Sequence, residues 1–396
     1  MTHALATGFR IVTVVLGTFV FGTLAASLQA DDVPPFEQFH VYTAGQDNVH
    51  TYRIPAFLVT SKGTLLVFCE ARKMSTRDVS PTDLVVKRST DLGRVWSPLQ
   101  TLVRGEGDDA MMNPCPVIDR ATGKILLLLN NAKRRDVGRY LLVESTDDGV
   151  TWSEPRDIGM HITPRIDSFV FGPGIGIQMR SGRFVIPGYA GKWDGDHLSE
   201  SYSRVLVSDD AGSSWSVGQP VSERGNESQV VELTDGRLLL NWRNTTETRC
   251  RGTAISADGG MTWSKTVYDR ALNECPCQAS LIRYSGLASD GQSRILFSNP
   301  DSSGPRASIS ARKQLTVRMS YDEGKTWPVK KLVSSGPSAY SGLAVLPDGR
   351  IGLVWEGGDA IYREGIRFAR FTLEWLTNIS STEVEVTTNA ANERTR

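Results

Sequence analysis

Short apolar runs, separated by polar or glycine-containing turns, recur along the chain. Six of them begin at Thr64, Lys124, Arg183, Arg237, Arg294 and Arg350, at intervals of 60, 59, 54, 57 and 56 residues. A period of this length is typical of propellers, solenoids and arrays. The runs are short and rich in Val, Ile, Leu and aromatic residues, and no long 3.6-residue periodicity appears. They therefore predict antiparallel β-strands rather than helices.

Each of these runs is preceded by another strand across a short link. "SQVVELT" and "RLLLNWR", for example, are joined by Asp-Gly, a favoured hairpin turn. A third strand such as "YLLVES" follows, and we expect a fourth after it. Six such units predict an all-β fold, a six-bladed β-propeller of four-stranded antiparallel blades, over residues 36–377.

Five third strands run into the motif Ser-x-Asp-x-Gly-x-x-Trp, which holds five of the nine tryptophans; the copies span 89–96, 145–152, 208–215, 256–263 and 320–327. Ser and Asp oxygens can accept N–H groups of a turn, and Gly tolerates a positive φ. Trp offers a large apolar face that can seat the turn on its blade. A catalytic role would require five equivalent sites, so we interpret the motif as structural.

Composition narrows the possible ligands. The 396 residues are 40% hydrophobic and 22% charged, with 44 Lys plus Arg against 44 Asp plus Glu. The chain has no surplus of basic residues that would indicate nucleic acid as a partner. Any preference for a charged ligand must therefore come from a local site.

The N-terminus differs from the rest of the chain. Residues 1–30 contain one basic side chain, Arg10, and no acidic one, and an apolar run covers 11–26. This layout is typical of a secretory signal peptide, with cleavage after Ala30. The alternative is an uncleaved membrane anchor, but the run is shorter than the ~20 residues of a comfortable span. We expect export, secreted or periplasmic, with no stable membrane span after cleavage. Residues 378–396 are predicted to form a polar tail.

The five cysteines are Cys69, Cys115, Cys250, Cys275 and Cys277. Their odd number leaves at least one without a partner inside the chain. "CPC" at 275–277 raises metal or redox chemistry, but no Cys/His pair with zinc spacing accompanies it. Buried thiols or a single disulfide are the expectation, with no metal and no cofactor.

Polar residues recur at equivalent strand ends. Ten or eleven residues before the second-strand starts lie Arg53, Asn113, Gly172, Glu227 and Tyr340, and six to eight residues after them lie Arg72, Arg243 and Glu356. Asp78 and Arg312 precede the third strands of their units. In a propeller these ends converge on one face. Arginines at strand ends are commonly solvated or paired, but several together repel one another unless an anion joins them. The arginine fork suits a carboxylate, so the group predicts an acidic ligand.

These residues and motifs resemble the sialidases (neuraminidases) of the bacterial and animal type. The similar segments are "YRIP" at 52–55, "EAR" at 70–72 followed by Asp78, "NESQVVEL" with "LNWR", "ARKQLTVR", and "SAYSGLAVLPDGRIGLVWE". The repeated Ser-x-Asp-x-Gly-x-x-Trp turns are similar to the Asp boxes of that family. The resemblance covers about residues 50–376.

The resemblance implies a retaining exo-α-sialidase acting on sialylated glycans. Tyr340 would be the nucleophile, Glu227 its base and Asp78 the acid/base. Arg53, Arg243 and Arg312, the last rather than Arg318, would hold the substrate carboxylate, with Glu356 orienting Arg53 and Arg72 assisting. A neutral phenol avoids the repulsion that a carboxylate nucleophile would meet from the acidic sugar, and sialidases are the known tyrosine exception among glycosidases.

Three alternatives stay open. The chain could be an exo-glycosidase for a related acidic sugar, a trans-glycosylase, or a sugar-binding propeller without catalysis, although the last would be expected to have lost Tyr340, Glu227 or Asp78. Met111, Met112 and Asn113 stand at the level of the site. They could line a pocket for the sugar's acyl group or pack in the core.

Overall fold

A computed structural model describes residues 1, 34–133, 136–166, 168–194, 197–222, 224–246, 248–285, 291–302 and 312–378. The chain divides into two units, Met1–Pro34 and Pro35–Arg396, and the strands found among the described residues lie in the second. Apart from Met1 and Asn378, the predicted signal peptide and polar tail lie outside the described residues.

The regular secondary structure in the described part of the second unit is almost entirely β-strand, which confirms the predicted all-β class. Helical turns among these residues are limited to η1 (Gly159–His161), η3 (Tyr362–Glu364) and α1 (Leu373–Thr377). The six apolar runs become β3 (Leu65–Arg72), β7 (Ile125–Lys133), β13 (Phe184–Asp194), β17 (Leu238–Asn244), β21 (Arg294–Pro300) and β24 (Ile351–Gly357). No helix in the described ranges is long and apolar enough to cross a membrane.

Strands that are consecutive in the sequence pair in antiparallel groups. The first group holds β2 (Thr51–Val59), β3, β4 (Thr82–Ser89) and β5 (Gln100–Val103), and the second β6 (Ala110–Ile118), β7, β8 (Asp136–Ser145) and β9 (Arg156–Asp157). The third pairs β13 with β11 (Phe169–Phe171), β12 (Ile177–Gln178) and β14 (His197–Ser208); β15 (Trp215–Val217) follows, with β10 (Ile162–Thr163) parallel to it.

The fourth group holds β16 (Gly225–Glu232), β17, β18 (Cys250–Ser256) and β19 (Val267–Asn273), and the fifth β20 (Ser280–Ser285), β21, β22 (Lys313–Ser320) and β23 (Val329–Val345). The long β23 pairs first with β22 and then with β24. β25 (Gly365–Phe371) pairs with β24 and with β1 (Phe36–Thr43), so the first strand completes the last group.

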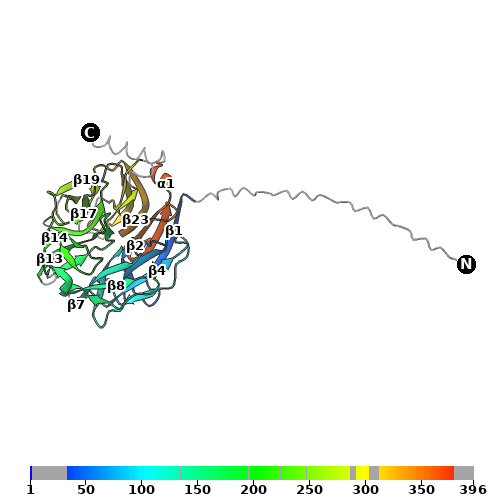
Figure 1. Ribbon diagram of the computed structural model, residues 1–396, viewed down its shortest axis with the longest axis horizontal. Helices are drawn as coiled ribbons and strands as arrows, with labels where there is room; N and C mark the ends of the chain where they lie inside the picture. The colour runs from blue at the N-terminus through cyan, green and yellow to red at the C-terminus, as the bar shows by residue number, and fades with distance from the viewer. Residues whose placement is uncertain are drawn as a thin grey trace. The chain divides into compact units, whose positions relative to one another are not determined.

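The first strands of neighbouring groups face one another. β2 contacts β6, β6 contacts β11 and β12, β12 contacts β16, β16 contacts β20, β20 contacts β23, and β23 contacts β2. Within this unit the groups follow one another in chain order, so that red β25 lies beside blue β1 (Figure 1). The ends of the first strands are therefore brought together, and with them the predicted site residues that these strands carry.

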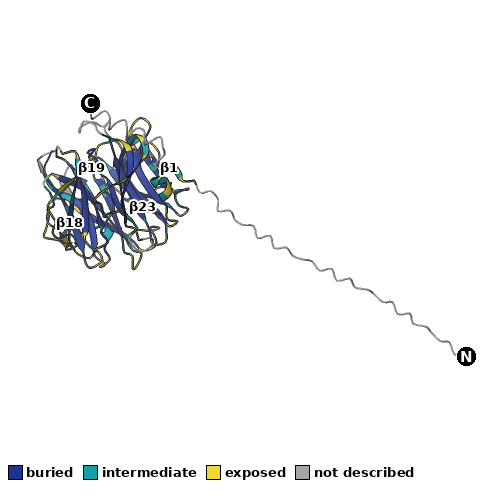
Figure 2. Cartoon of the chain, turned by 90° about the horizontal axis from the view of Figure 1, so that it is seen from above, coloured by how far each residue is buried: buried dark blue, intermediate teal, exposed yellow. Residues whose placement is uncertain are grey.

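Apolar side chains on both faces of the strands fill the layers between adjacent groups. One core cluster joins Phe57 and Val67 of the first group to Phe368 of the last, and another joins Phe68 of the first group to Leu127 of the second. Buried strands accordingly dominate the interior in Figure 2. Burial on both faces explains why these strands read as continuous apolar runs rather than as alternating patterns.

The five motif turns share one hydrogen-bond pattern. In the copy at 145–152, the Gly149 N–H donates to Ser145 Oγ at 2.9 Å, Ser145 Oγ donates to Asp147 Oδ1 at 2.9 Å, and the Thr151 N–H donates to Asp147 Oδ1 at 2.9 Å. Equivalent Gly-to-Ser and Ser-to-Asp bonds occur in the other four copies. The Asp side chain thus stabilises the turn by accepting backbone N–H groups of the same motif, as the structural interpretation predicts.

Candidate active site

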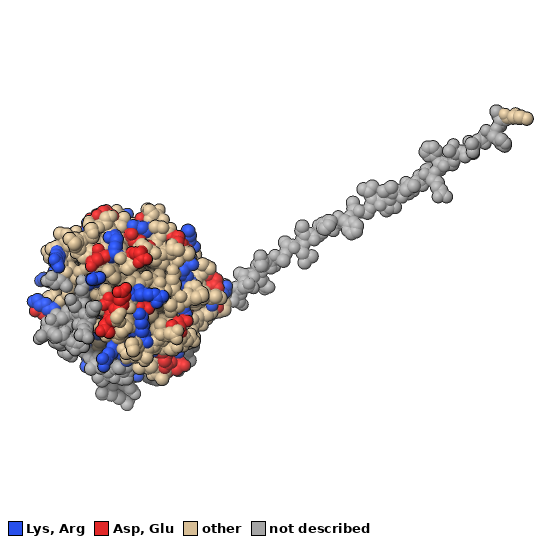
Figure 3. All heavy atoms as spheres, turned by 90° about the horizontal axis from the view of Figure 1, so that it is seen from below, with Lys and Arg blue, Asp and Glu red and all other residues tan. Residues whose placement is uncertain are grey.

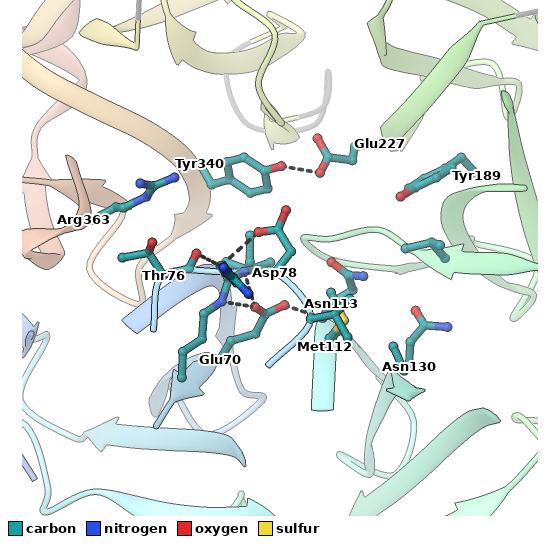
Figure 4. A pocket seen from close by; sticks show the side chains of 16 residues that line it. Glu70, Thr76, Asp78, Met112, Asn113, Asn130, Tyr189, Glu227, Tyr340 and Arg363 are labelled. Atoms are coloured by element: carbon teal, nitrogen blue, oxygen red, sulfur yellow. Dashed lines mark hydrogen bonds and ion pairs between the residues drawn. The ribbon is translucent and has the colours of Figure 1, made fainter. Parts of the chain in front are cut away.

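Four of the eight predicted site residues line one cavity of about 650 Å³: Arg72, Asp78, Glu227 and Tyr340. The other four are not among its lining residues, but Arg53, Arg243 and Arg312 contact Tyr340, and Glu356 contacts Arg53. In Figure 4 the side chains of Tyr340 and Glu227 point toward each other and are joined by a dashed line, and Asp78 lies below Tyr340 in this view. Arg72 ends β3, Glu227 lies in β16 and Tyr340 in β23, while Asp78 lies in the loop between β3 and β4.

Irregularities in strand pairing place these side chains. Between the first and second strands of four groups, the register shifts at Arg53/Ala56, Met112/Cys115, Gly225/Ser228 and Ser338/Ser341. Each shift spans or adjoins a residue of the predicted level: Arg53, Asn113, Glu227 and Tyr340. A β-bulge re-aims a side chain and increases local twist. The repeated bulge is therefore the local feature that turns these side chains toward the cavity.

Tyr340, Glu227 and Arg243 form a hydrogen-bonded group. The Tyr340 hydroxyl donates to Glu227 Oε1. Arg243 Nη1 donates to Glu227 Oε2 at 2.9 Å and to Tyr340 Oη at 3.2 Å. Burial and the charge of Glu227 raise the pKa of Tyr340 well above the usual value of a phenol. The phenol is thus neutral in the free protein, with an acceptor for its proton already in contact.

Arg53 is held by a buried carboxylate. Its Nε donates to Glu356 Oε1 at 2.6 Å, and the side chains of Arg53 and Glu356 are 3% and 0% exposed. The same oxygen accepts the N–H of Ile54 at 2.8 Å. Ile54 has a φ of 56°, which is rare for a β-branched residue. Glu356 therefore fixes both the guanidinium and the unusual backbone beside it.

Arg312 joins the group, and Arg318 does not. Arg312 lies over the rings of Tyr340 and Tyr362 at 5.5 and 5.4 Å, and Arg53 lies over the same two rings at 5.5 and 5.3 Å. Arg312 Nη2 donates to the Pro276 carbonyl at 2.7 Å. Arg318 instead is buried and pairs with Asp301 at 2.6 Å. Three guanidiniums, those of Arg53, Arg243 and Arg312, thus converge on Tyr340.

Arg72 connects the cavity wall to Asp78. Its Nη1 donates to Asp78 Oδ1 at 2.9 Å and to the Thr76 carbonyl at 2.8 Å, while Nε and Nη2 both donate to Glu70 Oε2. The Asp78 side chain is 75% exposed because it points into the open cavity. Burial among the surrounding walls favours the neutral acid, but Arg72, Arg53 and Arg312 outweigh this effect and lower the pKa of Asp78.

Several residues at the site escaped the sequence analysis. Glu70 is buried, braces Arg72 and accepts the Asn113 N–H at 3.0 Å. Tyr362 packs its buried ring under two of the arginines and accepts a hydrogen bond from Arg312 at 3.3 Å. Tyr189 lines the cavity near Glu227 (Figure 4). Glu70 stood within the quoted "EAR" segment, which was a usable signal; Tyr189 and Tyr362 had none.

The residues around Asn113 divide between the two roles considered for them. Met111 is buried in the core cluster between the first and second groups. Met112 and Asn113 line the cavity, on the same side as Asn130 (Figure 4). The core explanation therefore holds for Met111, and the pocket placement holds for its two neighbours.

The cysteines take no visible part in a metal centre. Cys69, Cys115 and Cys277 are buried, and the described residues contain no group of three or more His, Cys, Asp or Glu side chains arranged to hold a metal ion. The "CPC" segment instead contacts site residues: the Pro276 carbonyl accepts a hydrogen bond from Arg312, and Cys277 packs with Ile54 and Tyr340.

On the face shown in Figure 3, positively and negatively charged side chains are interspersed.

Comparison with known proteins places this geometry in a family. The BNR repeat-like domain family matches residues 47–353. The chain is 33% identical over 392 residues to the sialidase of Micromonospora viridifaciens, covering 90% of this chain but only 57% of that protein. It is 28% identical over 386 residues to Sialidase-3 of Homo sapiens, covering 81% of this chain and 89% of that protein.

Among solved structures, the Hadza microbial sialidase Hz136 superposes with a TM-score of 0.75 at 28% identity, over 86% of this chain and 69% of that chain. Sequence and structure thus agree over the strands that carry the cavity. The chain belongs to the family of sialidases with BNR repeat-like domains.

Proposed function

We propose that this chain is a retaining exo-α-sialidase, which hydrolyses terminal sialic acids of glycoconjugates through a tyrosine nucleophile. One observation carries the proposal: the neutral Tyr340 hydroxyl is hydrogen-bonded to Glu227, with Arg243 touching both, in a cavity that also holds Asp78. A sugar-binding protein would need the arginines but not a phenol engaged with a base.

Substrate binding would use the three converging arginines. Arg53, Arg243 and Arg312 offer planar donor forks suited to a carboxylate. The sialic acid carboxylate would face them, which brings its anomeric carbon toward Tyr340. Met112, lining the cavity, offers an apolar contact for the N-acyl group.

The first chemical step would form a tyrosyl–glycosyl intermediate. Tyr340 Oη bonds to the anomeric carbon as the bond from that carbon to the leaving oxygen breaks. Glu227 takes the phenolic proton, and Asp78 gives a proton to the leaving oxygen. The contact between the Tyr340 hydroxyl and Glu227 is in place before substrate arrives, which is the arrangement expected of a nucleophile activated by an adjacent base.

The second step would reverse these roles. Asp78, now ionised, takes a proton from water, whose oxygen bonds to the anomeric carbon as the bond to Tyr340 breaks. Glu227 returns its proton to the phenolate. Two successive inversions give net retention of configuration, the outcome expected of a covalent glycosyl–enzyme intermediate.

We also propose that the strand groups are the blades of a six-bladed propeller. Its support is the pairing of β1 with β25 and the contacts that run from each first strand to the next and back to β2. For the site, this architecture would mean that every bulged first strand faces the axis. The five motif turns stand outside the cavity lining, as structural elements of a blade rim would.

Export is a further proposal, supported by the acid-free N-terminus and the apolar run at 11–26. Sequencing the N-terminus of protein recovered from the culture medium or periplasm tests it. A mature N-terminus near Asp31 is expected, and intact Met1 or Thr2 would overturn it.

The mechanism is tested by trapping the intermediate. Wild-type protein incubated with a fluorinated sialic acid donor should carry one covalent sugar on Tyr340, as located by mass spectrometry. Tyr340→Phe removes only the hydroxyl, so it should stay folded and bind sialic acid while turnover of an aryl sialoside disappears. A label on another residue, or full turnover by this variant, would refute the tyrosine mechanism.

A further inference from the structure

A buried ion pair outside the cavity connects two of the three arginines of the site. Arg251 of β18 and Glu274, which follows β19, have their side chains wholly buried and pair at 3.1 Å. Neither lines the cavity. An ion pair of this kind contributes little net stability compared with apolar packing, because both charges lose their hydration. The pair is therefore of interest for the two segments that its hydrogen bonds hold in place.

One side of the pair contacts the strand that carries Arg243. Glu274 Oε2 accepts the N–H of Asn244, the residue next to Arg243, at 2.9 Å. Arg251 Nε donates to Asn241 Oδ1 at 2.8 Å on the same strand, β17. The end of β17 is thereby held on both its backbone and a side chain.

The other side contacts the segment that supports Arg312. Arg251 Nη1 donates to the Cys277 carbonyl at 3.0 Å, and Glu274 Oε1 accepts the Cys277 N–H at 3.4 Å. Pro276, between these two residues, accepts from Arg312 Nη2 at 2.7 Å. The segment from Glu274 to Cys277 links the fourth strand group to the fifth, and Arg312 precedes β22 of the fifth group.

We infer that Arg251 and Glu274 are positioning residues that set the separation of the Arg243 and Arg312 guanidiniums, and thereby the affinity of the site for a carboxylate. The inference rests on the proposed function, because it takes the arginines as the carboxylate clamp. Two forks on one carboxylate require accurate relative placement, and a misplacement of about 1 Å can cost ~100-fold in activity. The brace acts through Asn244 and Pro276 and touches no substrate.

The test compares two ligands, a 2,3-unsaturated sialic acid and its neutral carboxamide, by calorimetry. Their affinity ratio measures carboxylate recognition alone. Glu274→Gln should reduce the ratio at least about tenfold relative to wild type, in line with the cost of misplacement, and raise KM for an aryl sialoside more than it lowers kcat. Glu274→Asp, which keeps the charge, should restore part of the ratio and provides a second variant if Glu274→Gln does not fold.

Glu37→Gln is the matched control. Glu37 joins β1 to the fully buried Arg370 of β25 at 2.7 Å, away from the cavity lining. It should lower stability while leaving the ligand ratio and KM unchanged. A normal ratio in both folded Glu274 variants would overturn the positioning role. A wild-type protein that binds both ligands equally would instead refute the proposed function, so the two failures are distinguishable.

Discussion

Replacing Glu356 by Gln should lower the free energy of unfolding by about 3–5 kcal/mol, the cost of leaving one member of a buried ion pair uncompensated. Both side chains of the Glu356–Arg53 pair are nearly or wholly inaccessible, at 0% and 3% exposure. Burial alone would lower the pKa of Arg53, but the charge of Glu356 outweighs this and raises it. The variant removes that charge while keeping the shape.

The hydrogen bonds of Glu356 show which part of the stability loss comes from charge and which from geometry. Gln can still accept from Arg53 and from the Ile54 N–H through its amide oxygen, so the geometric part of the contact survives. Glu356 Oε2 has no hydrogen-bond partner in the structure, so the amide nitrogen that replaces it adds a buried donor without an acceptor, worth about 1–3 kcal/mol. The loss should therefore come from charge and an unmet donor rather than from a cavity.

Urea unfolding at neutral pH, followed by tryptophan fluorescence, measures the change. Glu232→Gln is the control, because Glu232 pairs at 3.2 Å with Arg180, whose side chain is 58% exposed, and such surface pairs are worth about 0–1 kcal/mol. Comparable losses in the two variants, or a loss below about 1 kcal/mol in Glu356→Gln, would contradict the reasoning from burial.

Four further outcomes are expected. Asp78→Asn should reduce kcat/KM about 100- to 10,000-fold on a sialyl-oligosaccharide and much less on an activated aryl sialoside; equal losses would exclude leaving-group protonation. The neighbouring arginines lower the pKa of Asp78, so kcat/KM of the wild type on the oligosaccharide should fall as pH rises from the acidic range. Arg72→Gln removes one of these charges and should move that fall to higher pH. An unmoved pH profile would refute the assignment of Asp78 as the acid. Arg312→Lys should raise KM, and Arg318→Lys should do so far less; exchanged outcomes would show the wrong arginine was chosen. Trp215→Ala, at a side chain 1% exposed, should cost about 3–5 kcal/mol of stability and leave kcat of the folded protein unchanged, whereas a stable but inactive variant would place the motif turns at the site.

The strands could be predicted from the sequence because the signals for a hairpin, two apolar runs and the turn between them, lie within a few residues of one another. The turn after "SQVVELT" and the apolar runs are short-range signals, and both became strand pairs at the expected places. The sharing of β23 between two groups was not predictable, since a strand of 17 residues that changes partner reads as two adjacent apolar segments. Burial of single motif residues was equally hidden: Trp152 is only half-buried, whereas Trp215 is buried.

The candidate residues could be grouped from their equivalent offsets, but their partners could not be assigned that way. Arg53 pairs with a carboxylate 303 residues later, and Tyr340 with one 113 residues earlier. Which acid meets which arginine depends on how bulges turn the first strands, and a bulge leaves no fixed sequence mark. Arg251 and Glu274 escaped notice for the same reason, because their partners are mainly backbone groups of distant segments.

Under the proposed mechanism, the pairing of Arg243 with Glu227 couples substrate binding to proton transfer from Tyr340. Glu227 is at once the counter-charge of Arg243 and the acceptor for the Tyr340 proton. If Glu227 took that proton in the free protein, the half-buried Arg243 would lose its counter-charge, which is unfavourable where desolvation already disfavours the charged guanidinium. A bound sialic acid carboxylate would replace the lost charge, so proton transfer would become accessible only when substrate is present. A fluorinated donor whose carboxylate is replaced by a primary amide should therefore fail to label Tyr340 even at concentrations that saturate the site. Labelling at the normal rate would show that the base acts without this compensation.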